Sequence, residues 1–316
     1  MVTASADHVT PAPWLSDQDV VDRVPLARAI EAVAAIVAKE ARGTARAIPK
    51  TMVTWDPRSA AHALGGYDAE TGRVAFKTWV NTPRGAAALL SLFDSAEGGL
   101  LATMEAVAVG QIRTASISGI ATREMSSPDA NELTIVGTGR QALLQVAAVA
   151  AVRPIERVRV WSPRAESREA FAETVERELG KPAVAHAALE EAVEGAPIVT
   201  VVTRAQDPFF PVGILAPGAH LNAVGAILPA NAEFESDLLA GSDLTVVDTL
   251  ENARKVSREL IEFYGDDWSS VRTLGQMLLG EVTRPASPNL TVFEGVGLGL
   301  GDLAVAALAV EAGESA

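Results

Sequence analysis

The spacing of hydrophobic residues differs between the first third of the chain and the rest. Val and Ile recur at helical spacing over residues 17–39, and short apolar runs separated by turn residues follow them. A helix is expected over 110–125, with Arg113 near its start. The runs predict strands at 52–55, 60–67, 74–80, 89–93, 100–105 and 106–109.

From residue 132 onward, β-branched apolar runs alternate with helical segments, which is typical of a parallel sheet with right-handed crossovers. The tail predicts an amphipathic helix at 268–279, a strand at 290–293 and a final helix at 302–310 that Asp302 would cap. We expect this last helix to return to the first domain. About six strands are predicted for the parallel sheet, at 133–136, 158–161, 183–187, 198–202, 220–224 and 244–247.

Composition narrows the function classes. A chain of 316 residues is long enough for two domains, and its 48% hydrophobic and 21% charged residues are typical of globular proteins. The net charge of -14 argues against nucleic-acid binding. The absence of cysteine excludes disulfides and thiolate metal sites, and the four histidines show no metal spacing, so we predict no metal.

We predict a cytoplasmic protein that acts on small molecules. No apolar run reaches the ~18 residues that a membrane-spanning helix needs. The N-terminus also lacks a basic region followed by an apolar core.

A glycine turn follows the predicted strand at 133–136. Gly137-Thr138-Gly139 leads into an apolar helical stretch from Ala142, which gives the spacing G-x-G-x-x-A. Glycines allow backbone N–H groups to approach a phosphate closely, and the helix N-terminus adds partial positive charge. The turn therefore predicts a dinucleotide site in a Rossmann-type sheet; the alternative is a tight turn before a buried helix, without a ligand.

The end of the next strand bears on the choice of cofactor. An NAD site expects an acid there for the ribose 2′-hydroxyl, whereas this chain has Ser162 and Arg164, followed by Arg168. Glu166 is too far into the following helix to bind the ribose. A hydroxyl with guanidinium groups suits a 2′-phosphate, so NADP(H) is favoured and NAD(H) remains possible.

Three cations stand out as candidate ligands for a carboxylate: Arg46, Lys77 and Arg113. Lys77 lies within the strand F-K-T-W-V, where burial would be costly unless its charge is paired. Alternatively, that strand is an edge and the lysine reaches water. Arg113 lies at the helix end that disfavours cations, so it suits a bidentate grip on a carboxylate, unless it is a surface residue. His62 is a candidate proton donor.

Together these features resemble the ornithine cyclodeaminase/μ-crystallin family over nearly the whole chain. Six blocks carry the resemblance, and their order and spacing make chance agreement improbable. They are R-A-I-P at 46–49, F-K-T-W-V-N-T-P at 76–83, R-T-A-S at 113–116, V-G-T-G-R-Q at 136–141, H-L-N-A-V-G at 220–225 and T-V-F-E-G-V-G-L-G-L-G-D-L-A at 291–304.

The resemblance implies an α/β fold: a doubly wound Rossmann domain at 119–299, plus an α+β substrate and dimerisation domain from both termini, 1–118 and 300–316. It implies a homodimeric NAD(P)-dependent oxidoreductase of amino acid metabolism, with hydride transfer at the carbon bearing nitrogen. Arg46, Lys77 and Arg113 would hold the carboxylate of an amino or imino acid, with Lys77 also catalytic. The implied cofactor residues are Thr114, Gly137, Thr138, Gly139, Arg140, Gln141, Ser162, Arg164, Val202, Thr203, Val224, Gly225 and Ala226.

Two departures from the family pattern bear on the reaction. Cyclodeaminases have V-G-G-D where this chain has Val224-Gly225-Ala226-Ile227, and Leu64 replaces the acid thirteen residues before the lysine. Isoleucine cannot shuttle a proton, and Ile227 would make the substrate pocket apolar. We therefore expect reduction of an α-imino acid or cyclic ketimine, or the reverse dehydrogenation, with the proton from Lys77 or an ordered water.

Two alternatives remain open from the sequence. One is an ornithine cyclodeaminase whose acid is supplied elsewhere, for example by Asp248 or Glu233. The other is a crystallin-like protein that binds NADPH without turnover.

Overall fold

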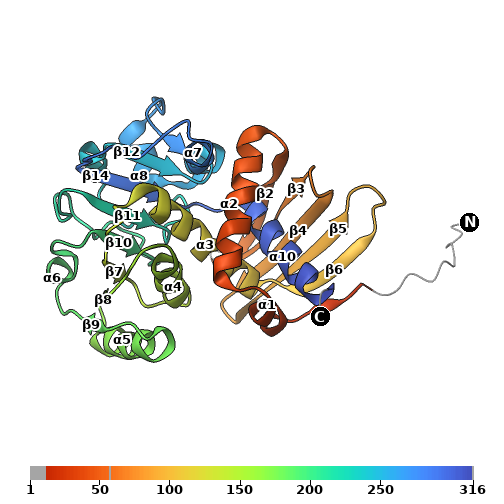
Figure 1. Ribbon diagram of the computed structural model, residues 1–316, viewed down its shortest axis with the longest axis horizontal. Coiled ribbons are helices and arrows are strands. Elements are labelled where there is room, and N and C mark those ends of the chain that lie inside the picture. The colour runs from red at the N-terminus through yellow and green to blue at the C-terminus, as the bar shows by residue number, and fades with distance from the viewer. Residues whose placement is uncertain (1–11, 57, 315–316) are drawn as a thin grey trace, which may run out of the picture.

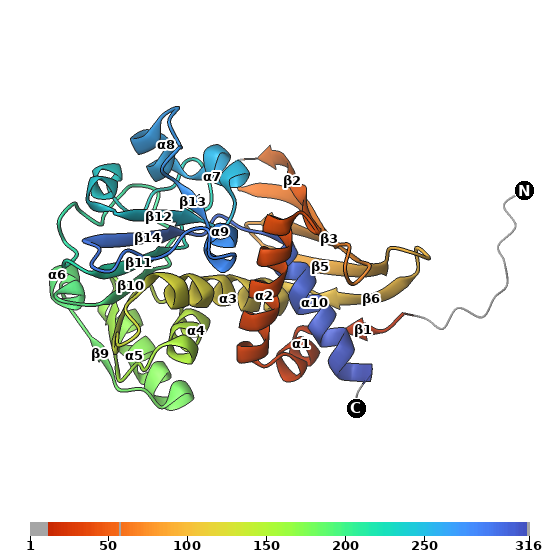
Figure 2. The same ribbon diagram turned by 45° about the horizontal axis from the view of Figure 1, so that its top comes forward.

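The computed structural model describes residues 12–56 and 58–314 and contains two β-sheets, joined by a long helix (Figures 1 and 2). Residues 1–11 and 315–316, which the predicted terminal domain includes, lie outside the described residues. Among the described residues, no helix is both long and apolar enough to cross a membrane.

The first sheet has six strands in the order β1-β6-β5-β4-β3-β2. Strands β2 to β6 form an antiparallel meander, and β1 pairs parallel with β6. The strands are β1 Trp14–Leu15, β2 Ala45–Asp56, β3 Ser59–Asp68, β4 Arg73–Thr82, β5 Gly85–Asp94 and β6 Leu100–Glu105.

One face of this sheet is covered by helices α2 (Leu26–Arg42) and α10 (Gly299–Glu314) (Figure 1). Strand alternation buries Ala75, Leu90 and Leu92 on that face. The helical pattern expected over 17–39 is interrupted at Pro25, which separates α1 (Asp17–Arg23) from α2 because proline lacks the N–H that a continuous helix needs.

The second sheet is parallel throughout, with eight strands in the order β13-β12-β14-β11-β10-β7-β8-β9. Apolar cores lie on both faces, with Leu133 and Ile135 in one and Val199 and Val201 in the other. The strands are β7 Glu132–Val136, β8 Arg157–Trp161, β9 Ala183–Ala185, β10 Ile198–Val201, β11 Ala219–Ala223, β12 Leu244–Val247, β13 Arg272–Thr273 and β14 Leu290–Glu294.

The helices of this half connect successive strands. They include a 3-10 helix, η1. Their bounds are α4 Ala142–Val152, α5 Ala165–Leu179, α6 Leu189–Val193, η1 Ser236–Gly241, α7 Leu250–Val256, α8 Arg258–Tyr264 and α9 Leu274–Leu278.

Helix α3 (Val107–Met125) runs from the first sheet to the second (Figure 2). Its far end is fixed to the parallel sheet by Asn222, whose Nδ2 donates to Thr122 Oγ1 at 2.9 Å. The predicted domain boundary at 118/119 falls inside this helix, and the division of the chain into two domains stays a prediction. The strand predicted at 106–109 is wrong, because Val107 already begins α3.

Two predictions for the tail need correction. The strand predicted at 290–293 is confirmed as β14, but it joins the interior of the parallel sheet between β11 and β12, which has eight strands instead of the expected six or so. The amphipathic helix predicted over 268–279 is wrong in its first half. There the chain forms a turn and the edge strand β13, and helix α9 begins at Leu274 after an N-cap by Thr273.

Candidate active site

The glycine turn lies where strand β7 ends, as the sequence predicts. Gly137 adopts φ 112°, and a Cβ there would lie 2.7 Å from Val202 O, so only glycine fits. A Cβ at Gly139 would meet nothing within 4 Å, so this glycine faces open space. Helix α4 begins three residues later, at Ala142. A conformation that requires glycine, open space and a helix N-terminus together fit the phosphates of a dinucleotide.

The next strand end lies beside this turn, because Gly137 N donates to Trp161 O at 2.9 Å. Ser162 is buried and its hydroxyl donates to Arg164 O at 3.3 Å. Arg168 Nη1 donates to Ser162 O at 3.3 Å, which draws a second guanidinium to the same strand end. Between the end of β8 at Trp161 and Glu166, which lies in the first turn of α5, there is no acidic residue.

Glu233 fastens two further strand ends together, a role that no pattern in the sequence indicates. Its Oε1 accepts from Thr203 N at 2.6 Å and from Thr203 Oγ1 at 2.7 Å, and its Oε2 accepts from Gly225 N at 2.8 Å. A Cβ at Gly225 would lie 2.3 Å from Glu233 Oε1. The carboxylate thus ties the ends of β10 and β11, where Val202, Thr203, Gly225 and their neighbours are predicted to contact the cofactor.

Lys77 and Arg113 come together around one carboxylate, that of Asp302. Asp302 Oδ1 lies 2.9 Å from Lys77 Nζ and 3.6 Å from Arg113 Nε. The side chains of Lys77 and Asp302 are 9% and 2% exposed, so this is a buried ion pair. Burial lowers the pKa of Lys77, the charge and hydrogen bond of Asp302 oppose this shift, and the charge of Arg113 adds to it.

Glycines on helices α3 and α10 leave room for the side chains of Lys77 and Arg113. A Cβ at Gly110 of α3 would lie 2.9 Å from Lys77 Nζ, and one at Gly301 of α10 would lie 3.3 Å from Arg113 Cβ. One at Gly297 would lie 3.8 Å from Arg113 Nη1. Gly110 and Gly301 therefore leave room for the two cations, whereas the distance at Gly297 is an ordinary contact distance.

Lys77 and Arg113, called the cation cluster below, lie close to the glycine turn because both the cluster and the turn contact α3. Gln111, between Gly110 and Arg113 on this helix, donates through Nε2 to Arg140 O of the turn at 3.4 Å. Thr114 lies on the next turn of α3, and its hydroxyl donates to Gly110 O at 2.7 Å. The residues predicted to bind substrate and those predicted to bind cofactor thus meet along one helix.

Lys50 is a further cation at this site that the sequence reasoning missed. Its Nζ lies 5.6 Å from the centroid of the Trp79 ring, and Lys77 Nζ lies 5.5 Å from the same centroid. Partial burial and the charges of Arg113 and Lys77 lower the pKa of Lys50. His62 stacks on Trp79 with centroids 4.6 Å apart, and burial and the charge of Lys50 lower the pKa of this histidine.

Other predicted residues stand apart from the cluster. Arg46 is exposed on β2, opposite Tyr67 in register, and forms no ion pair with the described residues. Ile227 is 43% exposed in the segment after β11. Within 12–56 and 58–314, no His, Asp and Glu side chains form a group that could hold a metal ion.

The two acids considered as substitutes for the missing cyclodeaminase aspartate are both occupied. Asp248, fully buried, accepts from Gly297 N at 2.7 Å and from Thr249 N at 2.8 Å. Glu233 holds Thr203 and Gly225. Burial raises the pKa of both carboxyls, while the N–H donors oppose the shift.

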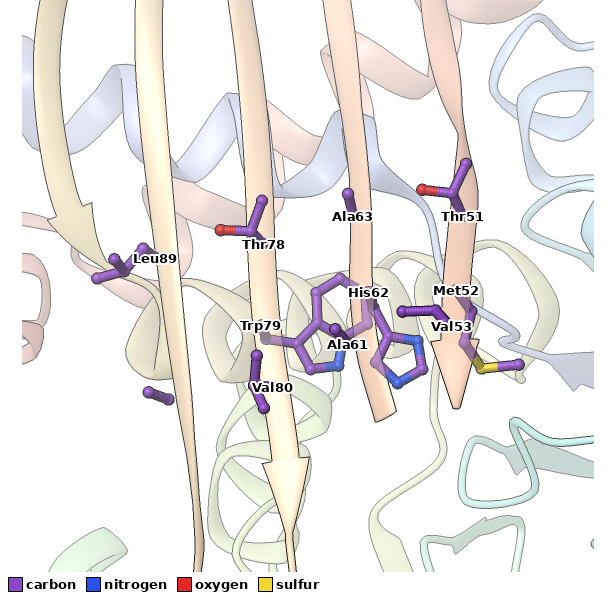
Figure 3. A pocket seen from close by; sticks show the side chains of 11 residues that line it. Thr51, Met52, Val53, Ala61, His62, Ala63, Thr78, Trp79, Val80 and Leu89 are labelled. Carbon is purple, nitrogen blue, oxygen red and sulfur yellow. The ribbon is translucent and has the colours of Figure 1, made fainter. Parts of the chain in front are cut away.

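Strands β2 to β5 also form a shallow apolar hollow of about 540 Å³ (Figure 3). Val53, Ala61 and Val80 share one face in the strand register, so the hollow lies on the face of the sheet opposite to the side chain of Lys77. Lys77, Arg113 and the glycine turn are not among its lining residues. Most of the lining is apolar, including Val53, Val80 and Leu89.

Comparison with known proteins gives consistent similarities. The family model described as ornithine cyclodeaminase/mu-crystallin family matches residues 14–315. A Delta(1)-pyrroline-2-carboxylate reductase of Bacillus cereus is 35% identical over 230 residues, which cover 69% of this chain and 68% of the relative. The ketimine reductase mu-crystallin of Mus musculus is 33% identical over 228 residues, covering 71% and 69%.

Among solved structures, the Delta(1)-pyrroline-2-carboxylate reductase of Thermococcus litoralis, in complex with NADH and L-proline, superposes with a TM-score of 0.90. The two are 26% identical, and the match covers 96% of this chain and 97% of that one. The match therefore extends through both sheets.

Proposed function

This chain belongs to the ornithine cyclodeaminase/mu-crystallin family, and from this membership we propose that it is an NAD(P)H-dependent imine reductase. Its substrate is an α-imino acid or a cyclic ketimine such as 1-pyrroline-2-carboxylate, and the reverse reaction is an amino-acid dehydrogenation. The observation that carries the proposal is the placement of the buried Lys77 and the partly buried Arg113 around Asp302, next to a glycine turn that fits a dinucleotide.

The cation cluster explains how a carboxylate would be bound. Arg113 faces Asp302 through Nε, and its two Nη atoms form no hydrogen bond with the described residues. They can therefore donate a bidentate pair of hydrogen bonds to the substrate carboxylate. Lys77 Nζ adds charge on the same side. Arg46 stays a prediction as a third ligand, because its register opposite Tyr67 and Val74 places it on the face of the sheet away from Lys77.

A bound reduced nicotinamide cofactor supplies the hydride at the carbon of the C=N bond. The turn 137–141 would hold the pyrophosphate, and residues 202–203 and 224–226 would contact the nicotinamide half. Lys77 then provides the proton for the nitrogen, since it is the ammonium group buried nearest to the carboxylate-binding guanidinium.

Cyclisation of L-ornithine is disfavoured, because it needs an acid–base group beside the substrate's distal amine. Ile227 and Leu64 occupy the positions of the two family acids, and Leu64 lies directly opposite Lys77 in the sheet. Glu233 and Asp248 are bound to backbone N–H groups.

We propose a preference for NADP(H) over NAD(H). Two guanidinium groups and no carboxylate lie at the end of β8, and Arg164 extends into solvent from there. This favours the 2′-phosphate of NADP(H), which an acid would repel.

We propose a homodimer in which a second copy covers the bare face of the first sheet. Helices cover only the opposite face. Val53, Phe76, Val80 and Leu89 lie on the bare face and are 41–61% exposed (Val80 41%, Phe76 43%, Leu89 46%, Val53 61%). Such an exposed apolar patch marks an interaction surface. The cytoplasmic location stays a prediction.

A substrate panel tests the proposed function. Oxidation of NADPH, followed at 340 nm, is measured with 1-pyrroline-2-carboxylate, 1-piperideine-2-carboxylate and a series of 2-oxo acids with ammonia or methylamine. We expect turnover of at least one cyclic or acyclic imine. Silence across the panel despite bound NADPH favours a crystallin-like binding protein, and faster release of ammonia from L-ornithine favours a cyclodeaminase.

A further inference from the structure

We propose that Asp302 is a positioning residue of this active site: it orients Arg113 toward the substrate carboxylate and holds Lys77 as the charged proton donor. The inference rests on the proposed function, which assigns Lys77 and Arg113 to the substrate. Asp302 was expected only to cap the last helix. The structure instead places it within the first turn of α10, with its carboxylate on the two cations.

The first line of evidence is the way in which one oxygen is shared. Oδ1 contacts both Lys77 Nζ at 2.9 Å and Arg113 Nε at 3.6 Å, whereas Oδ2 is buried without a hydrogen-bond partner among the described residues. A carboxylate kept only for stability would have its second oxygen satisfied. The buried, unpartnered oxygen indicates a site that is completed by something beyond this chain's described residues.

The second line is the orientation of the guanidinium. Asp302 Oδ1 lies 3.6 Å from Arg113 Nε, an ion-pair distance too long for a hydrogen bond, and this Nε is buried without a hydrogen-bond partner among the described residues. Gly297 and Gly301 flank the arginine, and a side chain at Gly301 would press on its stem. The arginine is thus held at its base and left open at its end, the geometry that bidentate carboxylate binding needs.

The third line is the balance of charge around Lys77. The groups that face its ammonium are Asp302 from α10, Arg113 from α3, Lys50 from β2 and the Trp79 ring of its own strand. Its cross-strand neighbours on β3 and β5, Leu64 and Leu90, are apolar. Asp302 is the single anion in this set. Burial and the neighbouring cations favour the neutral form of Lys77, and Asp302 is the group that favours its charged form.

In the proposed reaction, Lys77 must be charged in order to donate a proton. As hydride adds to the imine carbon, the C=N π bond breaks and its electron pair moves to nitrogen, which takes a proton from Lys77 Nζ. The lysine is left as a neutral amine and regains a proton from water. A lysine that is already neutral in the resting enzyme cannot donate, so Asp302 sets the pH range over which the enzyme is active.

The variant Asp302→Asn tests this role, because it keeps the shape and removes the charge. Asp68→Asn is the matched control, because Asp68 also forms a buried ion pair, with Lys39 Nζ at 2.8 Å and a side chain that is 5% exposed. Asp68 lies on β3, in the sheet that carries Lys77, but away from the cation cluster. Two readouts are used. One is the alkaline limb of the kcat profile against pH for a cyclic imine. The other is the pH midpoint for trace acetylation of Lys77, measured by mass spectrometry without substrate or cofactor.

We expect D302N to move both the alkaline limb and the labelling midpoint to lower pH by about one unit or more, with kcat at pH 8 reduced about tenfold or more. D68N should lower the thermal stability and leave both midpoints in place. Asp302→Glu, which restores the charge, should return the labelling midpoint toward that of the wild type. If D302N does not fold, Asp302→Ser takes its place.

The inference is overturned if D302N, like D68N, changes only the melting temperature and leaves both midpoints at the wild-type values. The labelling arm separates this inference from the proposed function. A wild-type protein that reduces no imine, but whose Lys77 midpoint still moves in D302N, refutes the proposed reaction and keeps the charge-holding role of Asp302.

Discussion

Replacement of Glu233 by glutamine is the most informative single change on the cofactor side of the site. Glu233 accepts three hydrogen bonds, two from Thr203 and one from Gly225, through two buried carboxylate oxygens. In E233Q, one oxygen remains and can serve Thr203, while the new NH2 group faces the N–H of Gly225 across the former 2.8 Å contact. Two donors then oppose each other, and the ends of β10 and β11 must separate.

The magnitude follows from that contact. A hydrogen bond to a charged group contributes about 1.5–3 kcal/mol, and a buried donor without a partner costs about 1–3 kcal/mol. Glutamine also removes the cost of burying a charge, the same cost that raises the pKa of Glu233. We therefore expect a net loss of about 1–3 kcal/mol in the free energy of unfolding.

The assay compares E233Q with E235Q, which changes an exposed glutamate two residues along the same segment that accepts a single hydrogen bond from Val212 N. Thermal unfolding gives the stability, and fluorescence titration with NADPH gives the Kd. We expect E233Q to weaken NADPH binding about tenfold and E235Q to leave it unchanged, because the separated strand ends carry the predicted cofactor contacts. Equal stability and equal Kd in the two variants would refute the tethering role.

Three further predictions follow from other parts of the structure. In Arg164→Gln, the KM for NADPH should rise about tenfold while that for NADH stays unchanged, in steady-state assays with each cofactor; equal changes for both cofactors would contradict the proposed preference. Burial raises the pKa of Glu259 to about 7 and that of Glu294 well above its usual value, so between pH 5 and 7 these two carboxyls hold more protons in the folded chain than in the unfolded chain, and their contribution lowers the melting temperature as the pH rises through that range. Burial lowers the pKa of His220 to about 3, and this group acts in the opposite direction. Glu259→Gln, which mimics the protonated acid, should flatten this dependence. Val53→Asp should convert the dimer to a monomer in light scattering, and a wild-type monomer would contradict the proposed interface.

The local features of the site could be predicted from the sequence. The glycine turn is encoded by neighbouring residues: a β-branched run, two glycines and a helix-forming stretch lie within twenty positions, and Gly137 does adopt a conformation that other residues avoid. The absence of an acid after β8 is likewise visible in neighbouring residues of the sequence. The parallel strands also followed from local patterns, since strands buried on both faces are continuously apolar.

Features that depend on distant pairing could not be predicted. Lys77 and Asp302 are 225 positions apart, and the burial cost of the lysine indicated only that a partner was needed, without indicating which one. Strand β14 follows a helix and several turns, yet it enters the middle of the sheet, because strand order depends on the whole set of packing partners. The apolar run at 106–109 predicts a strand and yet begins α3, because short runs do not distinguish a strand from the first turn of a buried helix.

Isotopic labelling shows whether hydride reaches the carbon that bears nitrogen. The enzyme is incubated with 1-pyrroline-2-carboxylate and NADPH that carries deuterium at both C4 positions, and the proline formed is examined by NMR. We expect proline with one deuterium at its α-carbon. Proline without deuterium at that carbon, or no formation of proline at all, would contradict hydride transfer to the α-carbon.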